Sequence, residues 1–183
     1  MAAMVIMAMS VGATMTATDS AVGEAIVMEA TQAATKVEYY LPYPGILPDS
    51  PLYKIKMVRD RIKIWMTFDE SEKARVELAM ADKRINAALA LAEGNKPALA
   101  VTTATKAEKY LEQSTNRVIK LIKLGKDEKS QLLNLEKAVA KHAEVLVEIA
   151  NKADEGQSKT INESIMLNKL LGERVGQLLL EVI

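Results

Sequence analysis

The 183-residue chain contains no cysteine, which excludes disulfide bonds, cysteine-ligated zinc, iron–sulfur clusters and thiol nucleophiles. It contains a single histidine, His142, so chemistry that needs two histidines is excluded too. Basic and acidic side chains balance at 24 each, without the basic excess of a nucleic-acid-binding protein. Nucleophile elbows and phosphate-binding glycine loops are also missing. The sequence therefore predicts no catalytic residue, no metal, no cofactor and no nucleic-acid partner.

Aromatic residues are scarce at 4%, and alanine, leucine, lysine and glutamate dominate, a mix typical of long helices. Apolar residues recur every three or four positions in five segments, at about 51–67, 70–93, 97–124, 128–155 and 159–182. We expect an all-α fold in which the last four segments form an antiparallel, up-down four-helix bundle and the first helix folds across it. The alternative is an extended pair of helical hairpins that completes its core as a homodimer.

Several residues indicate where these helices begin and end. Asp69 has the position of an N-cap, with Glu72 three residues later, and Asp127 precedes the segment at 128–155. Pro51, after Ser50, suits the first position of a helix. Gly94 is expected to end the segment at 70–93 in a left-handed conformation.

No charged residue occurs among residues 1–18, which read MAAMVIMAMSVGATMTAT. This apolar stretch, followed by small residues, is typical of a secretory signal, so we interpret residues 1–24 as a signal-like segment. An uncleaved membrane anchor and a cytoplasmic helix are the alternatives. Residues 25–38 are interpreted as a tether, and residues 39–183 as the helical domain. The expected location is extracytoplasmic, secreted or associated with the cell envelope, or else membrane-anchored through the N-terminus.

Four of the five tyrosines and four of the five prolines lie within residues 39–53, YYLPYPGILPDSPLY. Proline fixes φ and extends the residue before it, so residues 39–50 are predicted to be an extended strap with a turn at Pro44-Gly45. We expect the strap to pack along the bundle and to meet Tyr53 and Trp65. Alternatively, its tyrosines form an exposed platform for a sugar or a peptide. The residues of this structural motif are Pro44, Gly45, Pro48, Pro51, Trp65, Phe68 and Asp69.

The segment KIKMVRDRIK, at 54–63, is the most basic part of the chain, with Asp60 as its only acid. It could meet anionic lipid headgroups or an acidic polymer of the envelope. The alternative is a solvated flank in which Arg59, Asp60 and Arg61 pair with charged residues near the start of the next helix, such as Asp69, Glu70 and Glu72. With the strap tyrosines, the predicted contact surface comprises Tyr39, Tyr40, Tyr43, Tyr53, Lys54, Lys56, Arg59, Arg61 and Lys63.

His142 lies on the apolar stripe of the segment at 128–155, which predicts a partly buried, hydrogen-bonded histidine. If it is neutral, stability should fall as the pH drops below its unfolded pKa of about 6.5. A pH-sensitive or haem-ligating role is the alternative. A ferritin-like di-iron site is excluded, because Val139 stands where the Glu-x-x-His pattern needs a glutamate.

The stretches PYPGILPDSPLYKIKMVRDRI (42–62) and TFDESEKARVELAMADKRI (67–85) resemble a family of uncharacterised helical domains from exported proteins of bacteria and archaea, a domain of unknown function. The resemblance covers about residues 40–112. It implies an export-linked helical domain and carries no catalytic residue. The prediction is a non-enzymatic exported module that binds or scaffolds an unknown protein or component at the cell envelope. A membrane-anchored sensor or regulatory domain is the alternative.

Overall fold

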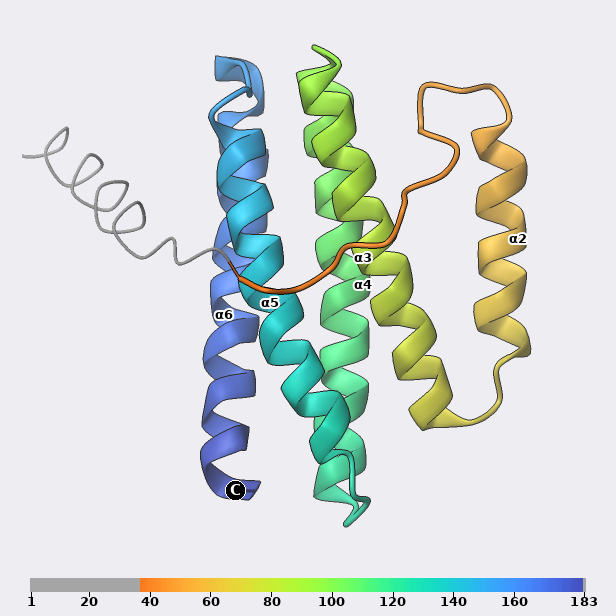
Figure 1. The fold of residues 1–183 in the computed structure, drawn as a ribbon, viewed down its shortest axis with the longest axis vertical. Helices are drawn as coiled ribbons and strands as arrows, with labels where there is room; N and C mark the ends of the chain where they lie inside the picture. The colour runs from red at the N-terminus through yellow and green to blue at the C-terminus, as the bar shows by residue number, and fades with distance from the viewer. Residues whose placement is uncertain (1–36, 183) are drawn as a thin grey trace, which may run out of the picture. The chain divides into compact units, whose positions relative to one another are not determined.

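A computed structural model describes residues 37–182, which form an extended strap followed by five α-helices (Figure 1). The helices are α2 (Tyr53–Met66), α3 (Glu70–Glu93), α4 (Pro97–Lys123), α5 (Lys129–Ala150) and α6 (Ser158–Val182), with a short 3₁₀ helix at Glu155–Gln157. Residues 37–182 contain no strand, so the predicted all-α class is confirmed. The signal-like segment at 1–24 and residues 25–36 of the tether lie outside the described residues.

The four long helices alternate in direction along the chain, as an up-down bundle requires (Figure 1). The hairpins α3–α4 and α5–α6 make the most extensive packing, and the two hairpins join where α4 meets α6 and α3 meets α5. The predicted apolar stripes form the core: every predicted stripe position of α4, from Ala100 to Leu121, is buried. The buried apolar side chains divide into two clusters, one around Leu111, Leu135 and Leu171, the other around Ile85 and Leu146.

Helix α2 lies beside α3, on the outside of the bundle, and does not fold across it (Figure 1). Among the helices that the structure describes, α3 is the only one on which α2 packs. The expectation of a helix lying across the bundle is therefore wrong. The packing of α2 instead uses the side of α3 that carries Arg84, a buried residue that interacts with Tyr53 of α2.

The predicted cap at Asp69 is confirmed, and the predicted helix end at Gly94 is corrected. The Asp69 carboxylate accepts the Glu72 N–H at 2.8 Å as the cap of α3. After α3, however, the left-handed residue is Asn95, with φ of 57°, and Gly94 keeps φ of −77°. Gly94 still donates its N–H to the Ala90 carbonyl, so the helical turn continues one residue further, and asparagine tolerates the left-handed region.

Two predicted helix boundaries shift for local reasons. Helix α5 ends at Ala150 rather than near residue 155, because Asp154 belongs to a new start, where its N–H donates to the Gln157 side chain at 3.1 Å. Helix α2 begins at Tyr53 rather than Pro51. Its preceding turn is closed by the Tyr53 N–H, which donates to the Ser50 carbonyl at 3.0 Å.

Candidate functional site

The apolar stripe predicted for the first helix exists, but it faces away from the bundle. Trp65 is 79% exposed and Ile55 68%, and Phe68, just beyond the end of α2, is 89% exposed. The prediction that Trp65 meets the strap is wrong. We call this surface the α2 apolar face; its members are Leu52, Ile55, Val58, Ile62, Trp65, Met66 and Phe68.

Basic side chains border the α2 apolar face on both sides. Residues three, four or seven positions apart share one side of a helix. Lys54 and Arg61, seven apart, lie on one edge of the apolar face, and Arg59 and Lys63, four apart, lie on the other. All four residues are exposed. The surface therefore combines an apolar centre with two cationic borders.

The opposite side of α2 packs on α3 through Tyr53, Lys56, Asp60 and Ile64, again three or four positions apart. Asp60 is only 6% exposed and accepts a charge-assisted hydrogen bond from Arg59 at 3.0 Å. Lys56 turns inward, and its burial lowers its pKa. Lys56 and Tyr53 were predicted to belong to the contact surface, but the structure places them beneath it.

The predicted ion pairs between α2 and the start of α3 are absent from the described part of the chain. Asp69 is occupied as a helix cap, Glu70 pairs with Arg117 of α4, and Glu72 pairs with Arg75 at 3.6 Å. The acids near the start of α3 thus have partners within the bundle. The cations on the borders of α2, apart from Arg59, form no ion pair with an acid of residues 37–182.

The strap packs on the bundle through alternate residues, as an extended chain should. Tyr39 is half-buried and donates its hydroxyl proton to Asp82 at 2.8 Å, whereas Tyr40 and Tyr43 are 88% and 81% exposed. Burial, reinforced by the charge of Asp82, raises the pKa of Tyr39. The strap packing is confirmed for Tyr39 and for Leu41, which contacts the core. The other two tyrosines stand in solvent.

Side chains of the helices hold the strap at several of its carbonyls. Lys56 donates to the carbonyls of Pro44 at 2.5 Å and Ile46 at 3.1 Å, on either side of Gly45, whose φ is 69°. Asn86 donates to the Pro42 carbonyl at 3.0 Å. The predicted turn at Pro44-Gly45 is displaced: the chain bends at Ile46, after the left-handed Gly45, and the hydrogen-bonded turn lies at residues 47–50, where the Ser50 N–H donates to the Leu47 carbonyl at 3.0 Å.

A buried polar layer crosses the centre of the bundle, between the two apolar clusters. His142 is fully buried; its Nδ1 lies 2.7 Å from Glu108 Oε1, and its Nε2 lies 3.2 Å from Asp82 Oδ1. The second Glu108 oxygen accepts from Asn168 at 3.0 Å. We call Asp82, Glu108, His142 and Asn168 the polar layer. Together with Tyr39, they form one hydrogen-bonded chain from the strap to α6.

Since both ring nitrogens of His142 face carboxylates, both donate, and the ring is an imidazolium. Burial by itself lowers the pKa of His142, but the hydrogen bonds and charges of Asp82 and Glu108 outweigh burial and raise it to about 9. The hypothesis of a neutral His142 that loses stability in acid is therefore wrong, because the ring is held between two carboxylates. Neither nitrogen remains free for haem. No group of three acidic or histidine side chains within residues 37–182 is arranged to hold a metal ion.

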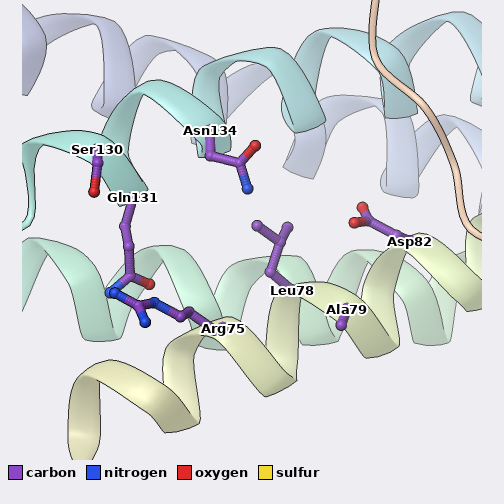
Figure 2. A pocket seen from close by; sticks show the side chains of 7 residues that line it. All are labelled: Arg75, Leu78, Ala79, Asp82, Ser130, Gln131 and Asn134. Carbon is purple, nitrogen blue, oxygen red and sulfur yellow. The ribbon is translucent and has the colours of Figure 1, made fainter.

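A groove of about 430 Å³ lies between α3 and α5 and reaches the edge of the polar layer at Asp82 (Figure 2). Most of its polar residues are already engaged: Gln131 donates to Ser71 at 2.7 Å, Asp82 accepts from Tyr39 and His142, and Arg75 pairs with Glu72 at 3.6 Å. Figure 2 shows Leu78 of α3 and Asn134 of α5 directed into the space between the helices. The remaining lining residues are Arg75, Ala79 and Ser130. This shallow groove therefore presents few unsatisfied groups to a ligand.

Sequence reasoning singled out His142 but missed its two carboxylate partners. Asp82, Glu108, His142 and Asn168 each lie within three residues of the centre of their helices. The midpoints of antiparallel helices of similar length meet in a bundle. A polar residue near the middle of each helix, on or beside its apolar stripe, was the signal that could have found the layer.

In comparisons with known proteins, the family model for a domain of unknown function, DUF5667, matches residues 45–156 of the chain. The match begins in the strap and runs through α5, further along the chain than the resemblance, which covers about residues 40–112. Neither the curated proteins nor the solved structures contain a significant match. Within residues 37–182, no helix combines the length and the apolar character needed to cross a membrane.

Proposed function

Because the chain belongs to the DUF5667 family, whose name assigns no activity, we propose a function from its surface: a non-enzymatic module, exported, that attaches to the anionic surface of the cell envelope through α2. The sequence supports export through the signal-like segment at 1–24. Attachment is supported by the exposed α2 apolar face and its cationic borders. Reaction chemistry has little support, since the polar layer is buried and its groups are paired with one another.

The observation that carries the proposal is the orientation of α2. Ile55, Val58, Ile62 and Trp65 form one continuous stripe, and no other described helix covers it. Fully burying one such side chain stabilises a complex by about 1.5–3 kcal/mol. Exposed apolar residues scattered singly are normal, but a contiguous stripe with a polar rim marks an interaction surface. An apolar face with cationic borders fits a partner that has anionic groups above apolar material.

Cell fractionation tests this function with two matched double variants. Ile62→Ser with Trp65→Ser removes the centre of the α2 apolar face, and Tyr40→Ser with Tyr43→Ser removes two equally exposed aromatic residues of the strap. We expect the wild-type protein and the strap variant in the envelope fraction, and the α2 variant in the soluble extracytoplasmic fraction. Retention of the α2 variant in the envelope fraction would disprove attachment through α2.

Mass spectrometry of the same fractions tests the export part of the proposal. A mature N-terminus between about residues 14 and 24 is expected if the signal-like segment is cleaved. An intact Met1 in the cytosolic fraction would contradict export. An intact Met1 in the membrane fraction would instead favour the membrane-anchored alternative.

A further inference from the structure

We propose that the partner of α2 is the surface of an anionic phospholipid bilayer, in which α2 lies parallel to the membrane plane; this inference rests on the proposed attachment function. A helix that lies in a membrane interface places tryptophan, phenylalanine and aliphatic residues in the acyl boundary and lysine or arginine beside them. Trp65, Phe68 and Ile62 supply the first set. Lys54, Arg61, Arg59 and Lys63 supply the second, on both borders.

The charge of the surface fits anionic headgroups. Asp60 is the only acid of α2; it is buried on the α3 side and already accepts from Arg59. The exposed side of α2 therefore carries cations and no anion. Lysine and arginine side chains extend from an interfacial helix so that their aliphatic stems stay in apolar surroundings while their charges reach the headgroups. Because α2 has cations on both borders of its apolar face, its charged side chains can reach the headgroups on both sides of the helix.

A lipid surface explains both parts of this face, and the other partners explain only one. An acidic wall polymer would neutralise Lys54 and Arg61 but would leave Ile55 and Trp65 in water. A second copy of the chain would cover the apolar stripes but would bring like-charged borders together, which opposes association. The bilayer offers hydrocarbon beneath a layer of negative charge, so it satisfies the stripe and the borders together.

The position of the aromatic residues indicates which part of α2 enters most deeply. Trp65 and Phe68 lie at the end of α2 and in its connection to α3, and they are among the most exposed large apolar residues of the described chain. Tryptophan prefers the level of the headgroups and the adjoining acyl chains. We therefore place the residue 65–68 end of α2 as the deeper anchor.

Fluorescence offers a specific test, because Trp65 is the only tryptophan of the chain. The full chain is mixed with vesicles of equal parts phosphatidylcholine and phosphatidylglycerol, with or without brominated acyl chains, and with vesicles of phosphatidylcholine alone. We expect a blue shift and bromine quenching of Trp65 with the anionic vesicles. Raising the salt to about 1 M, where the Debye length is about 3 Å, should weaken binding. Quenching reports on α2 itself, whatever the N-terminal segment does.

A matched pair of charge-reversal variants distinguishes binding through α2 from nonspecific electrostatic attraction of the whole protein. Lys54→Glu with Arg61→Glu changes one border of α2, and Lys159→Glu with Lys169→Glu makes the same change in net charge on exposed positions of α6. Each cation near an anionic membrane contributes about a fivefold increase in affinity, so the α2 variant should bind at least about 30-fold more weakly than wild type. The α6 variant should bind much as wild type does.

Three results would overturn the lipid partner. The first is no blue shift or quenching with anionic vesicles; if envelope attachment in cells still depends on Trp65, the attachment function stands and its partner is a polymer or a protein. The second is equal weakening by the α2 and α6 reversals, which would indicate nonspecific charge attraction. The third is a stable dimer in solution whose Trp65 is already shielded without vesicles, which would assign α2 to a second copy.

Discussion

At the scale of single residues, His142 should make the folded state less stable as the pH becomes alkaline. The folded pKa is about 9 and the ordinary value is 6.5, so protonation favours the folded state. The contribution, on the order of 3 kcal/mol, is complete below pH 6.5 and disappears as the pH rises through about 9. We expect the melting temperature to fall between these pH values. Because His142 is the only histidine, its single imidazole signal in an NMR titration of an untagged chain should have its midpoint near pH 9.

The variant His142→Gln is the control for this titration. It keeps an N–H donor but cannot take up a proton near neutral pH. The fall in stability between pH 6.5 and about 9 should therefore disappear in this variant. A wild-type midpoint below pH 6.5 would contradict the charged imidazolium.

Thr115 gives a second test at this scale. Its hydroxyl oxygen is the only buried side-chain nitrogen or oxygen atom in the described residues without a hydrogen-bond partner. Replacing an unsatisfied hydroxyl by a methyl group removes a desolvation cost, so Thr115→Val should raise the free energy of unfolding by about 1 kcal/mol. Thr103, on the same helix, is the matched control: it is 2% exposed and donates to the Leu99 carbonyl at 2.7 Å. Thr103→Val should instead destabilise in urea titrations, and equal effects of the two variants would refute this account.

At the scale of elements, the strap should depend on one hydroxyl group. Tyr39→Phe removes the donor to Asp82, a hydrogen bond to a charged group worth about 2 kcal/mol, and should expose the strap to proteases and to hydrogen exchange. Tyr40→Phe makes the same chemical change at the neighbouring, exposed position and should have no effect. Equal protection of the strap in both variants would show that its other contacts, such as those of Lys56, Asn86 and Lys96, hold it without the Tyr39 hydroxyl.

The elements also show what sequence patterns determine and what they leave open. Proline spacing predicted the strap, and three-to-four spacing with caps such as Asp69 predicted five helices close to their observed ends. The sequence correctly predicted an apolar stripe on α2, but it could not predict whether this stripe faces the bundle or the solvent. Periodicity states that Ile55 and Ile62 share a face, but it does not state whether another element covers that face. The inner side of α2 carries Tyr53, Lys56 and Asp60; of these, Tyr53 and Lys56 had been predicted as part of the contact surface, and Asp60 as part of a solvated flank in the alternative.

At the scale of the whole molecule, the polar layer divides an apolar core into two halves, and this division was not predicted. The stripes of α5 and α6 contained His142 and Asn168, but Asp82 and Glu108 lie one position beside the small-residue stripes of α3 and α4. Charged residues are almost never fully buried unless they are paired, so single-helix reasoning assigns them to the surface. Their burial follows from partners on other helices, and only the register of four helices brings these partners together.

The layer is expected to define helix register rather than to add stability, and a comparison of two variants tests this. A buried ion pair roughly repays its desolvation, so replacing the whole layer by apolar residues of similar size is often neutral or stabilising, whereas removing one member costs about 3–5 kcal/mol. His142→Leu alone should therefore lower the free energy of unfolding by that amount. The quadruple variant Asp82→Val, Glu108→Met, His142→Leu and Asn168→Val should recover most of the loss in chemical denaturation.

Register is the property that the quadruple variant should lose. In wild type, His142 can meet both carboxylates in only one relative position of α3, α4 and α5, whereas an all-apolar core accepts neighbouring positions at similar energy. We expect a broader unfolding transition and fewer resolved side-chain signals in NMR spectra of the quadruple variant. If the free energy of unfolding of the quadruple variant is as far below that of wild type as for His142→Leu, the layer itself stabilises the fold. Recovered stability with a sharp, single set of signals would show that apolar packing alone fixes the register.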